Sequence, residues 1–191
     1  MSDLVLSNLT INGRPVGLFY EEPTPTFDSV TIGTQTWLSK NLDIDDGLGG
    51  IASVTVNYGQ GDVTEYFYTW DAAVRVAATV QGWHLPTQAE WNTLISTVGG
   101  GNSADKLKST YGWFQNNGTD NYGFSAFPSG NYKFNTGESA NESLSCYYWS
   151  ATERSSESVQ TTRMFYGDQT INSSWYGMKS SGYQVRLIKD T

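Results

Sequence analysis

The sequence has one cysteine, one histidine and no long apolar run. Cys146 alone cannot form an intrachain disulfide or a cysteine-based metal cluster. No stretch approaches the roughly 20 apolar residues of a membrane-spanning helix, so membrane insertion is not expected. Residues 1–8 lack the basic segment and apolar core of a secretory signal. Either the protein is not exported by that route, or its signal has been removed.

Basic residues are also scarce. Lysine and arginine number 11 against 19 aspartates and glutamates, which gives a formal net charge of −8. A protein that binds the phosphate backbone needs clustered lysine and arginine side chains. Nucleic acid is therefore not expected as a partner.

Aromatic residues and glycine are abundant, with 7 Trp, 12 Tyr and 20 Gly among 191 residues, while charged residues are only 16%. Much of the surface must then consist of Ser, Thr, Asn, Gln and Tyr. This composition is typical of an adaptable binding surface. A turn-rich β protein with an uncharged polar exterior would have the same composition, which leaves both interpretations open.

The clearest local pattern is a helix predicted over residues 87–98. Thr87 can cap its first turn, and Glu90 lies three residues further on, which is the capping-box spacing. Large apolar side chains recur at i, i+3, i+4 and i+7, namely Trp91, Leu94, Ile95 and Val98. One face of this helix must therefore be covered by the rest of the domain.

Residues 1–27 form a separate N-terminal β-arm in this interpretation. Asn12-Gly13 is a strong hairpin-turn signal, and residues 21–26 read as an extended Pro/Thr linker. A lone hairpin is marginally stable in water, so the arm is expected to dock on a neighbouring subunit or a larger assembly. The alternative is an arm folded back on its own domain, which comprises residues 28–191.

The main domain is predicted to be α+β with an antiparallel sheet. A hairpin with Gly33 near its turn is expected over 30–38, and Thr69 can cap a second helix. Ser103 can cap a short third helix over 104–109. The remaining strand candidates are 53–58, 122–128, 146–152, 161–166, 171–176 and 183–189.

Six blocks, in order, resemble the Fibrobacter succinogenes major paralogous domain: 31–42, 68–73, 82–91, 118–126, 148–153 and 185–190. Residues 1–27 have no counterpart in it. The family is similar to C-type-lectin-like folds of the formylglycine-generating-enzyme branch. The resemblance implies a twisted antiparallel sheet with two main helices and long irregular loops that carry ligands. Some relatives are variable proteins of diversity-generating retroelements, and several of those sit on phage tails or bacterial surfaces.

The resemblance does not extend to the known chemistry. Formylglycine-generating enzymes use a cysteine pair with copper, whereas Cys146 is alone and reads as a small apolar filler. His84 is expected to hydrogen-bond locally and fix the strand-to-helix turn. The sugar-binding motifs of calcium-dependent lectins are absent. Asp120 and Asn121 could hold a structural calcium, but a local Asx-type turn is the preferred interpretation. No enzyme activity and no cofactor are therefore expected.

The segment 154–183 is the predicted ligand surface. Small polar residues dominate it, with rigid aromatics that supply contact area at low entropy cost. The candidate ligand-binding residues are Arg154, Arg163, Tyr166, Asn172, Trp175 and Tyr176. The alternative places Trp175 in the core and leaves an ordinary loop.

These observations predict a non-enzymatic binding module on a virion surface, as a phage tail or head fibre or receptor-binding protein. Its ligand would be a bacterial surface glycan or protein. The arm would join other virion proteins, and the chain would form a homo-oligomer, such as a trimer. The alternatives are an adhesion domain of a bacterial cell-surface protein or lipoprotein, and a purely structural virion decoration.

Overall fold

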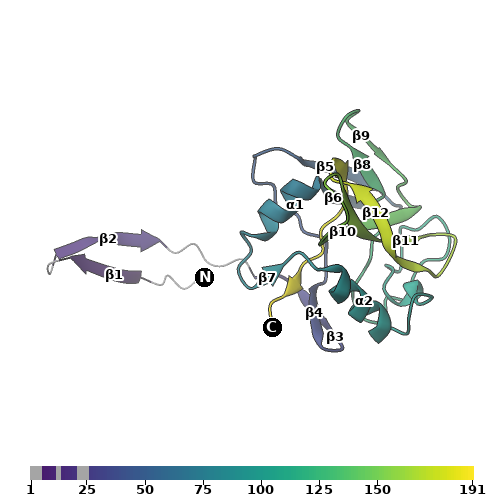
Figure 1. Cartoon of the computed structure of the whole chain (residues 1–191), viewed down its shortest axis with the longest axis horizontal. Coiled ribbons are helices and arrows are strands. Elements are labelled where there is room, and N and C mark those ends of the chain that lie inside the picture. Colours follow the sequence, from purple (N-terminus) through teal and green to yellow (C-terminus); the bar gives the residue numbers. More distant parts are fainter. Residues whose placement is uncertain (1–5, 12–13, 21–25) are drawn as a thin grey trace.

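The computed structural model describes residues 6–11, 14–20 and 26–191, and it shows two α-helices with several antiparallel sheets (Figure 1). The α+β prediction is confirmed at this level. The N-terminal strands β1 (Leu6–Ile11) and β2 (Arg14–Tyr20) pair antiparallel, as expected for the arm. The predicted turn at 12–13 and almost all of the linker lie outside the described residues. How the arm docks therefore stays a prediction.

A four-stranded sheet joins the two ends of the main domain. Its order is β3 (Ser29–Ile32), β4 (Gln35–Leu38), β14 (Ile188–Lys189) and β7 (Trp83–His84). Gly33 lies in the β3–β4 turn with φ of 63°, a conformation that glycine adopts without strain. Figure 1 shows the C-terminus emerging beside β7 and β4. The predicted hairpin over 30–38 is confirmed.

Both predicted main helices begin at the predicted caps. Helix α1 (Trp70–Ala77) follows the hairpin β5 (Ile51–Asn57) and β6 (Asp62–Tyr68), and the Thr69 side chain accepts a hydrogen bond from the Ala72 backbone N–H. Helix α2 (Gln88–Thr97) begins with the complete capping box of Thr87 and Glu90.

The last third of the chain forms two further three-stranded sheets. One has the order β10 (Ser145–Glu153), β11 (Ser158–Phe165), β12 (Ile171–Met178), so β12 lies at an edge. The other has the order β13 (Ser181–Gly182), β8 (Asn131–Lys133), β9 (Glu138–Ala140). The strands predicted near 146–152, 161–166 and 171–176 are confirmed. Strands β8 and β9 were not predicted.

Three local predictions are wrong. Residues 122–128 are not a strand, because Ser125 has φ of 51° and the segment pairs only through an isolated bridge from Lys108 to Ala126. Within 183–189 only β14 is a strand. The third helix is a single 3₁₀ turn, η1 (Ala104–Lys106), and Ser103 makes no side-chain cap. Its short length leaves few hydrogen bonds to stabilise an α-helical form.

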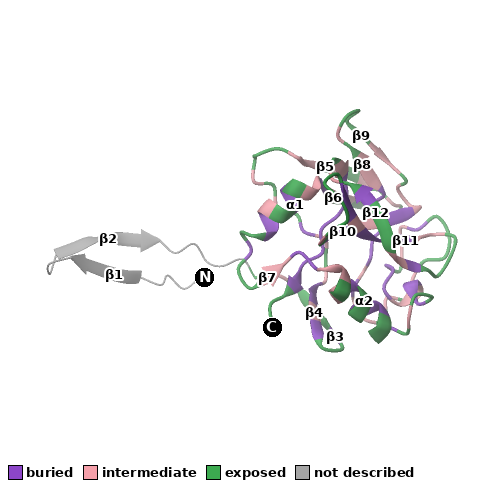
Figure 2. Cartoon of the chain, in the orientation of Figure 1, coloured by how far each residue is buried: buried purple, intermediate pink, exposed green. Residues whose placement is uncertain are grey.

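Two apolar clusters lie on opposite faces of the β10–β11–β12 sheet, because successive strand residues point to opposite sides. Cys146 and Tyr148 belong to the cluster under α2, whereas Trp149 and Val159 belong to the cluster under α1. Figure 2 shows buried residues on α1 and through the middle of this sheet, whereas the visible turns of α2 are mostly exposed. The expected apolar face of α2 is buried in the first cluster.

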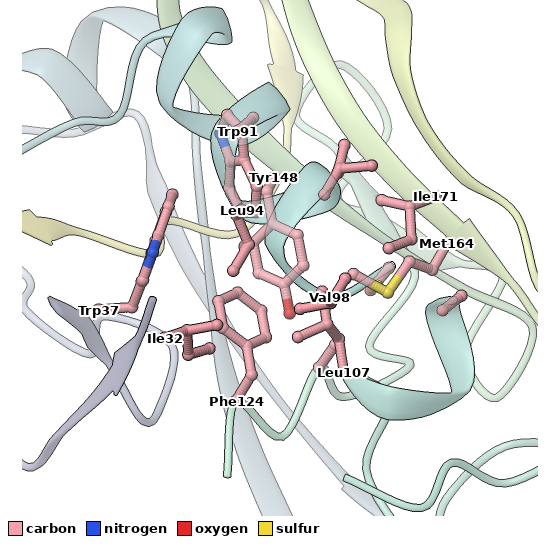
Figure 3. Close-up of a cluster of buried hydrophobic side chains, with 14 of the residues drawn as sticks. Ile32, Trp37, Trp91, Leu94, Val98, Leu107, Phe124, Tyr148, Met164 and Ile171 are labelled. Atoms are coloured by element: carbon pink, nitrogen blue, oxygen red, sulfur yellow. The ribbon is translucent and has the colours of Figure 1, made fainter. Parts of the chain in front are cut away.

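The cluster under α2 is dense in aromatic rings. The Trp37 and Trp91 ring centroids lie 4.8 Å apart, and Phe124 lies edge-on to both at 5.9 and 6.1 Å. Figure 3 shows Trp91 and Leu94 reaching from α2 toward Tyr148 and Phe124, with Trp37 alongside. Burying each such side chain stabilises the fold by about 1.5–3 kcal/mol. The helix thus fixes the sheet that carries the predicted ligand surface.

Candidate ligand-binding surface

The edge strand β12 carries a β-bulge where it pairs with β11. Thr161 pairs with Trp175, and Arg163 pairs with Asn172, so two steps along β11 match three along β12. The Asn172 side-chain Oδ1 accepts the Ser174 backbone N–H at 3.0 Å inside this bulge. Beyond the bulge, Trp175 and Tyr176 pair in regular register with Thr161 and Gln160. On this edge strand, residues 174–176 are all exposed.

Two neighbouring aromatic rings on this edge each contact one arginine. The Arg163 guanidinium carbon lies 4.3 Å from the Trp175 ring centroid, and the Arg154 carbon lies 4.1 Å from the Tyr176 centroid. The two rings are 6.5 Å apart at an interplanar angle of 24°. We call these four residues the aromatic–arginine ladder. Each cation–π contact at such an exposed site contributes about 0.5–1 kcal/mol.

The ladder is open to solvent. Trp175 is 40% exposed and Tyr176 is 51% exposed, so the alternative that Trp175 is a core residue is wrong. Arg154 is exposed and Arg163 is half-buried. Among the described side chains, Arg163 Nε is one of the few buried donors without a hydrogen-bond partner. The ladder therefore offers flat aromatic area together with cationic donors.

Tyr166 and Asn172 lie beside the ladder rather than in it. Tyr166 is half-buried, packs edge-on against Phe114 at 5.5 Å, and reaches the ladder only through Phe165. Phe165 lies 5.8 Å from the Arg163 guanidinium. Asn172 uses its oxygen for the bulge, so it shapes the strand.

Phe114 and Phe165 were not predicted as part of this surface. Phe114 is 64% exposed and comes from a distant loop. The sequence offers no signal that joins it to β11, because the contact depends on how the loop folds back. Phe165 lies inside the predicted segment 154–183, and its aromatic side chain could have marked it as a candidate there.

A buried lysine holds the connection between β11 and β12. Lys108 has no exposed surface, and its Nζ donates to the Phe165 carbonyl at 2.7 Å and the Asp168 carbonyl at 2.8 Å. The ammonium also lies 4.7 Å from the Trp113 ring centroid. Burial lowers the pKa of Lys108. This lysine, which the sequence did not single out, positions one end of the ladder.

The ladder rests on a packed aromatic base. Tyr147 lies opposite Arg163 in the strand register, and its ring stacks on Tyr183 at 4.9 Å and 15°. Tyr183 also contacts Trp149, with centroids 4.6 Å apart. Gly177 leaves room for this base, since a Cβ there would lie 2.3 Å from the Tyr183 ring. The rings beneath the ladder are therefore closely packed.

His84 makes the local contacts that the sequence predicted. Its Nε2 lies 2.8 Å from Glu90 Oε1, and its Nδ1 lies 2.6 Å from Asp190 Oδ1. Burial lowers the pKa of His84, but the two carboxylates outweigh it and raise the pKa above its usual value. The imidazole therefore ties the start of α2 to the end of the chain.

Cys146 and Asp120 are also engaged locally. Burial raises the pKa of the Cys146 thiol to about 12, so it stays protonated in the core. The Asp120 carboxylate accepts the Ser125 N–H at 2.8 Å and the Ser125 hydroxyl at 2.5 Å, as a local turn requires. Across the described residues there is no group of three or more His, Cys, Asp or Glu that could hold a metal ion. In the same part of the chain, no helix has the length and apolarity to cross a membrane.

Comparison with known proteins gave one match. A family model described as Fibrobacter succinogenes major domain matches residues 30–189, from within β3 to the end of β14. The comparisons with curated proteins and with solved structures returned no match.

Proposed function

Since the chain belongs to the Fibrobacter succinogenes major domain family, we propose that it is a non-enzymatic binding module with a C-type-lectin-like fold. Two helices that flank antiparallel sheets, joined by long loops, support this fold. In such a scaffold the helices and sheets hold still, while the loops and edge strands near the C-terminus contact the ligand.

The aromatic–arginine ladder is the observation that carries the proposal. Two large adjacent aromatics stand exposed on an edge strand, where burial would otherwise favour them by about 1.5–3 kcal/mol each. Tryptophan, tyrosine and arginine are the residues most enriched among energetic hot spots of interfaces. Their flat faces suit stacking on a sugar ring or on a side chain of a surface protein.

The proposed setting is a phage tail or head fibre that recognises a bacterial surface glycan or protein. The paired strands β1 and β2 would join the module to other virion proteins by adding to a sheet or packing on a neighbouring copy. The alternative setting is a bacterial cell-surface protein or lipoprotein with an adhesion role. A lipobox in the full-length gene would favour that alternative, whereas neighbouring phage structural genes would favour the virion.

The test is binding of the intact chain to a glycan array and to whole bacterial cells. We expect the double variant Trp175→Ala/Tyr176→Ala to lose binding by at least about tenfold, as for hot-spot aromatics. Leu48→Ala is the matched control, because Leu48 is a 73% exposed apolar residue in a different loop.

The outcomes separate the alternatives. Equal binding by the ladder variant and by the Leu48 control would refute the ladder as the binding surface. An intact chain that binds neither glycans nor cells would favour the purely structural decoration. Thermal unfolding of both variants serves as the control for folding.

A further inference from the structure

A pocket lies away from the ladder and shares no residue with it. Its volume is about 410 Å³, within the range of roughly 300–1,000 Å³ typical of small-molecule sites. It opens between strand β6 and three loops, at residues 39–43, 109–111 and 123–127. The residues that matter for its chemistry are Asn41, Glu65, Tyr66, Tyr111, Phe127 and Arg186.

The floor is organised by a buried arginine whose donors are all used. Arg186 has no exposed surface, and its Nη1 donates to the carbonyls of Leu38, at 3.0 Å, and Phe124. Its Nε and Nη2 both donate to Asn41 Oδ1, at 3.2 and 2.6 Å. The second Nη2 proton points to the Ser125 carbonyl at 3.5 Å. Since a guanidinium has five N–H donors, none is left to bind an anionic ligand.

Asn41, which Arg186 holds in place, in turn holds the Glu65 carboxylate. Its Nδ2 donates to Glu65 Oε2 at 2.6 Å, which occupies one of the two amide protons and only part of the acceptor capacity of the carboxylate. Burial raises the pKa of the Glu65 carboxyl, although Asn41 and Arg186 act in the opposite direction. The pocket thus holds a fixed acceptor and a fixed donor side by side.

The walls are aromatic, rich in hydroxyl groups and without net charge. Two cations, Lys40 and Arg186, balance two carboxylates, Asp43 and Glu65. Tyr111 lies edge-on to Phe127, with centroids 5.2 Å apart. Residues with hydroxyl side chains make up much of the remainder, namely Ser39, Thr64, Tyr66, Ser109, Thr110, Tyr111 and Ser125. The hydroxyls of Thr64, Ser109 and Ser125 already hydrogen-bond within the protein. A neutral ligand with many hydroxyls and an apolar face fits this lining better than an ion of either sign.

We propose that this pocket binds a neutral sugar ring, as a site separate from the aromatic–arginine ladder. Glu65 accepts a hydrogen bond from a sugar hydroxyl, and the remaining N–H of Asn41 donates one. The ring of Tyr111 covers the apolar face of the sugar. Arg186 does not touch the ligand, and it acts as a positioning residue that holds Asn41 and Glu65 in place.

The proposal is tested by protein-observed NMR titration of the full chain with N-acetylglucosamine and galactose. Glucosamine, a cation at neutral pH, and glucuronate, an anion, are the charged comparisons. We expect a neutral sugar to shift the amide signals of Asn41, Glu65 and Tyr111 at about 10 mM, which is the weak range of a single sugar ring. Shifts by the charged sugars alone, or by none of the four, would overturn it.

Three variants in the pocket and one in the ladder locate the site. Tyr111→Ala removes the apolar wall and is expected to weaken binding at least about tenfold, while Tyr111→Phe keeps the ring and most of the affinity. Glu65→Gln exchanges one carboxylate oxygen for an NH₂ donor and removes the negative charge, and it is expected to abolish the shifts. Thermal unfolding checks that this variant folds despite the unbalanced Arg186. Trp175→Ala/Tyr176→Ala should leave the shifts unchanged. Loss in that ladder variant, or full binding by Tyr111→Ala, would refute the site.

Discussion

Single side chains join segments that are far apart in this chain. Arg186 reaches Asn41 across 145 residues of sequence, and His84 reaches Asp190 across 106. Lys108 holds two carbonyls of the β11–β12 connection. Each of these side chains makes at least two polar contacts, so each fixes more than one point of the chain. The polar network thereby makes the loops of the main domain specific, while the apolar clusters supply most of the stability.

The contacts of His84 predict a pH-dependent contribution to stability. The folded-state pKa of His84 is raised by Asp190 and Glu90, so its stabilising effect is full below the unfolded pKa of about 6.5 and is lost as pH rises through the folded value. We expect His84→Gln to lower the free energy of unfolding by about 0.5 kcal/mol more at low pH than at high pH. The effect is small because the side chain is 39% exposed and solvent screens it.

Urea unfolding of both proteins at about pH 5.5 and about pH 9 measures this difference. The Glu90 carboxyl remains ionised at both values, because the pKa of Glu90 is lowered by its hydrogen bonds despite its burial. An equal loss of stability at the two pH values would show that His84 acts by packing alone.

At the scale of elements, α2 and the β12 bulge have different origins. Helix α2 is specified by nearby residues, through its capping box and apolar face. The bulge depends on pairing with β11 and on the turn at Asn172. The helix therefore forms the same way in many contexts, whereas the exposed ladder exists only in the assembled sheet.

The capping box makes a second prediction. Thr87→Ala removes the side chain that accepts the Glu90 N–H at 3.3 Å, and we expect it to lower the free energy of unfolding by about 1 kcal/mol. Thr93→Ala is the matched control within the same helix. Thr93 is exposed and its hydroxyl only bonds back to the Ala89 carbonyl, so its loss should be neutral or slightly stabilising. Denaturant unfolding of the two variants compares them. If the two variants changed the free energy of unfolding equally, the capping hydrogen bond of Thr87 would contribute nothing to stability.

For the whole molecule, the four-stranded sheet closes the domain by placing β14 between β4 and β7. The matched family segment begins within β3 and ends with β14. All strands that close this sheet therefore belong to the main domain. This arrangement supports the prediction that residues 28–191 fold without the arm, as a unit with its own two apolar clusters.

A fragment of residues 28–191 tests that prediction. We expect its melting temperature to stay within about 3 °C of the full chain, since about 1 kcal/mol shifts a domain of this size by 2–4 °C. We propose that the arm holds the full chain in a homo-oligomer, so we also expect the fragment to sediment as a monomer in analytical ultracentrifugation while it keeps ligand binding. A larger drop in melting temperature would support the alternative that the arm folds back on its own domain.

Much of the fold followed from short-range patterns. The caps of both helices, the hairpin around Gly33 and three of the C-terminal strands were predicted, because capping and periodicity act within a few residues. The segment 122–128 was mistaken for a strand because its aromatic residues are buried in a loop, with Ser125 at a positive φ. Burial of a loop gives the same sequence pattern as burial of a strand.

The sequence by itself determined the family and the α+β class, and it led to the prediction that the ligand surface lies within residues 154–183. Only the tertiary structure decided that Arg154 and Arg163 stand against those rings, and that Asn41, Glu65 and Arg186 meet in one pocket. The reason is physical. Composition and periodicity report local preferences, whereas a binding surface depends on strand register, a bulge and loop closure between residues far apart in the chain.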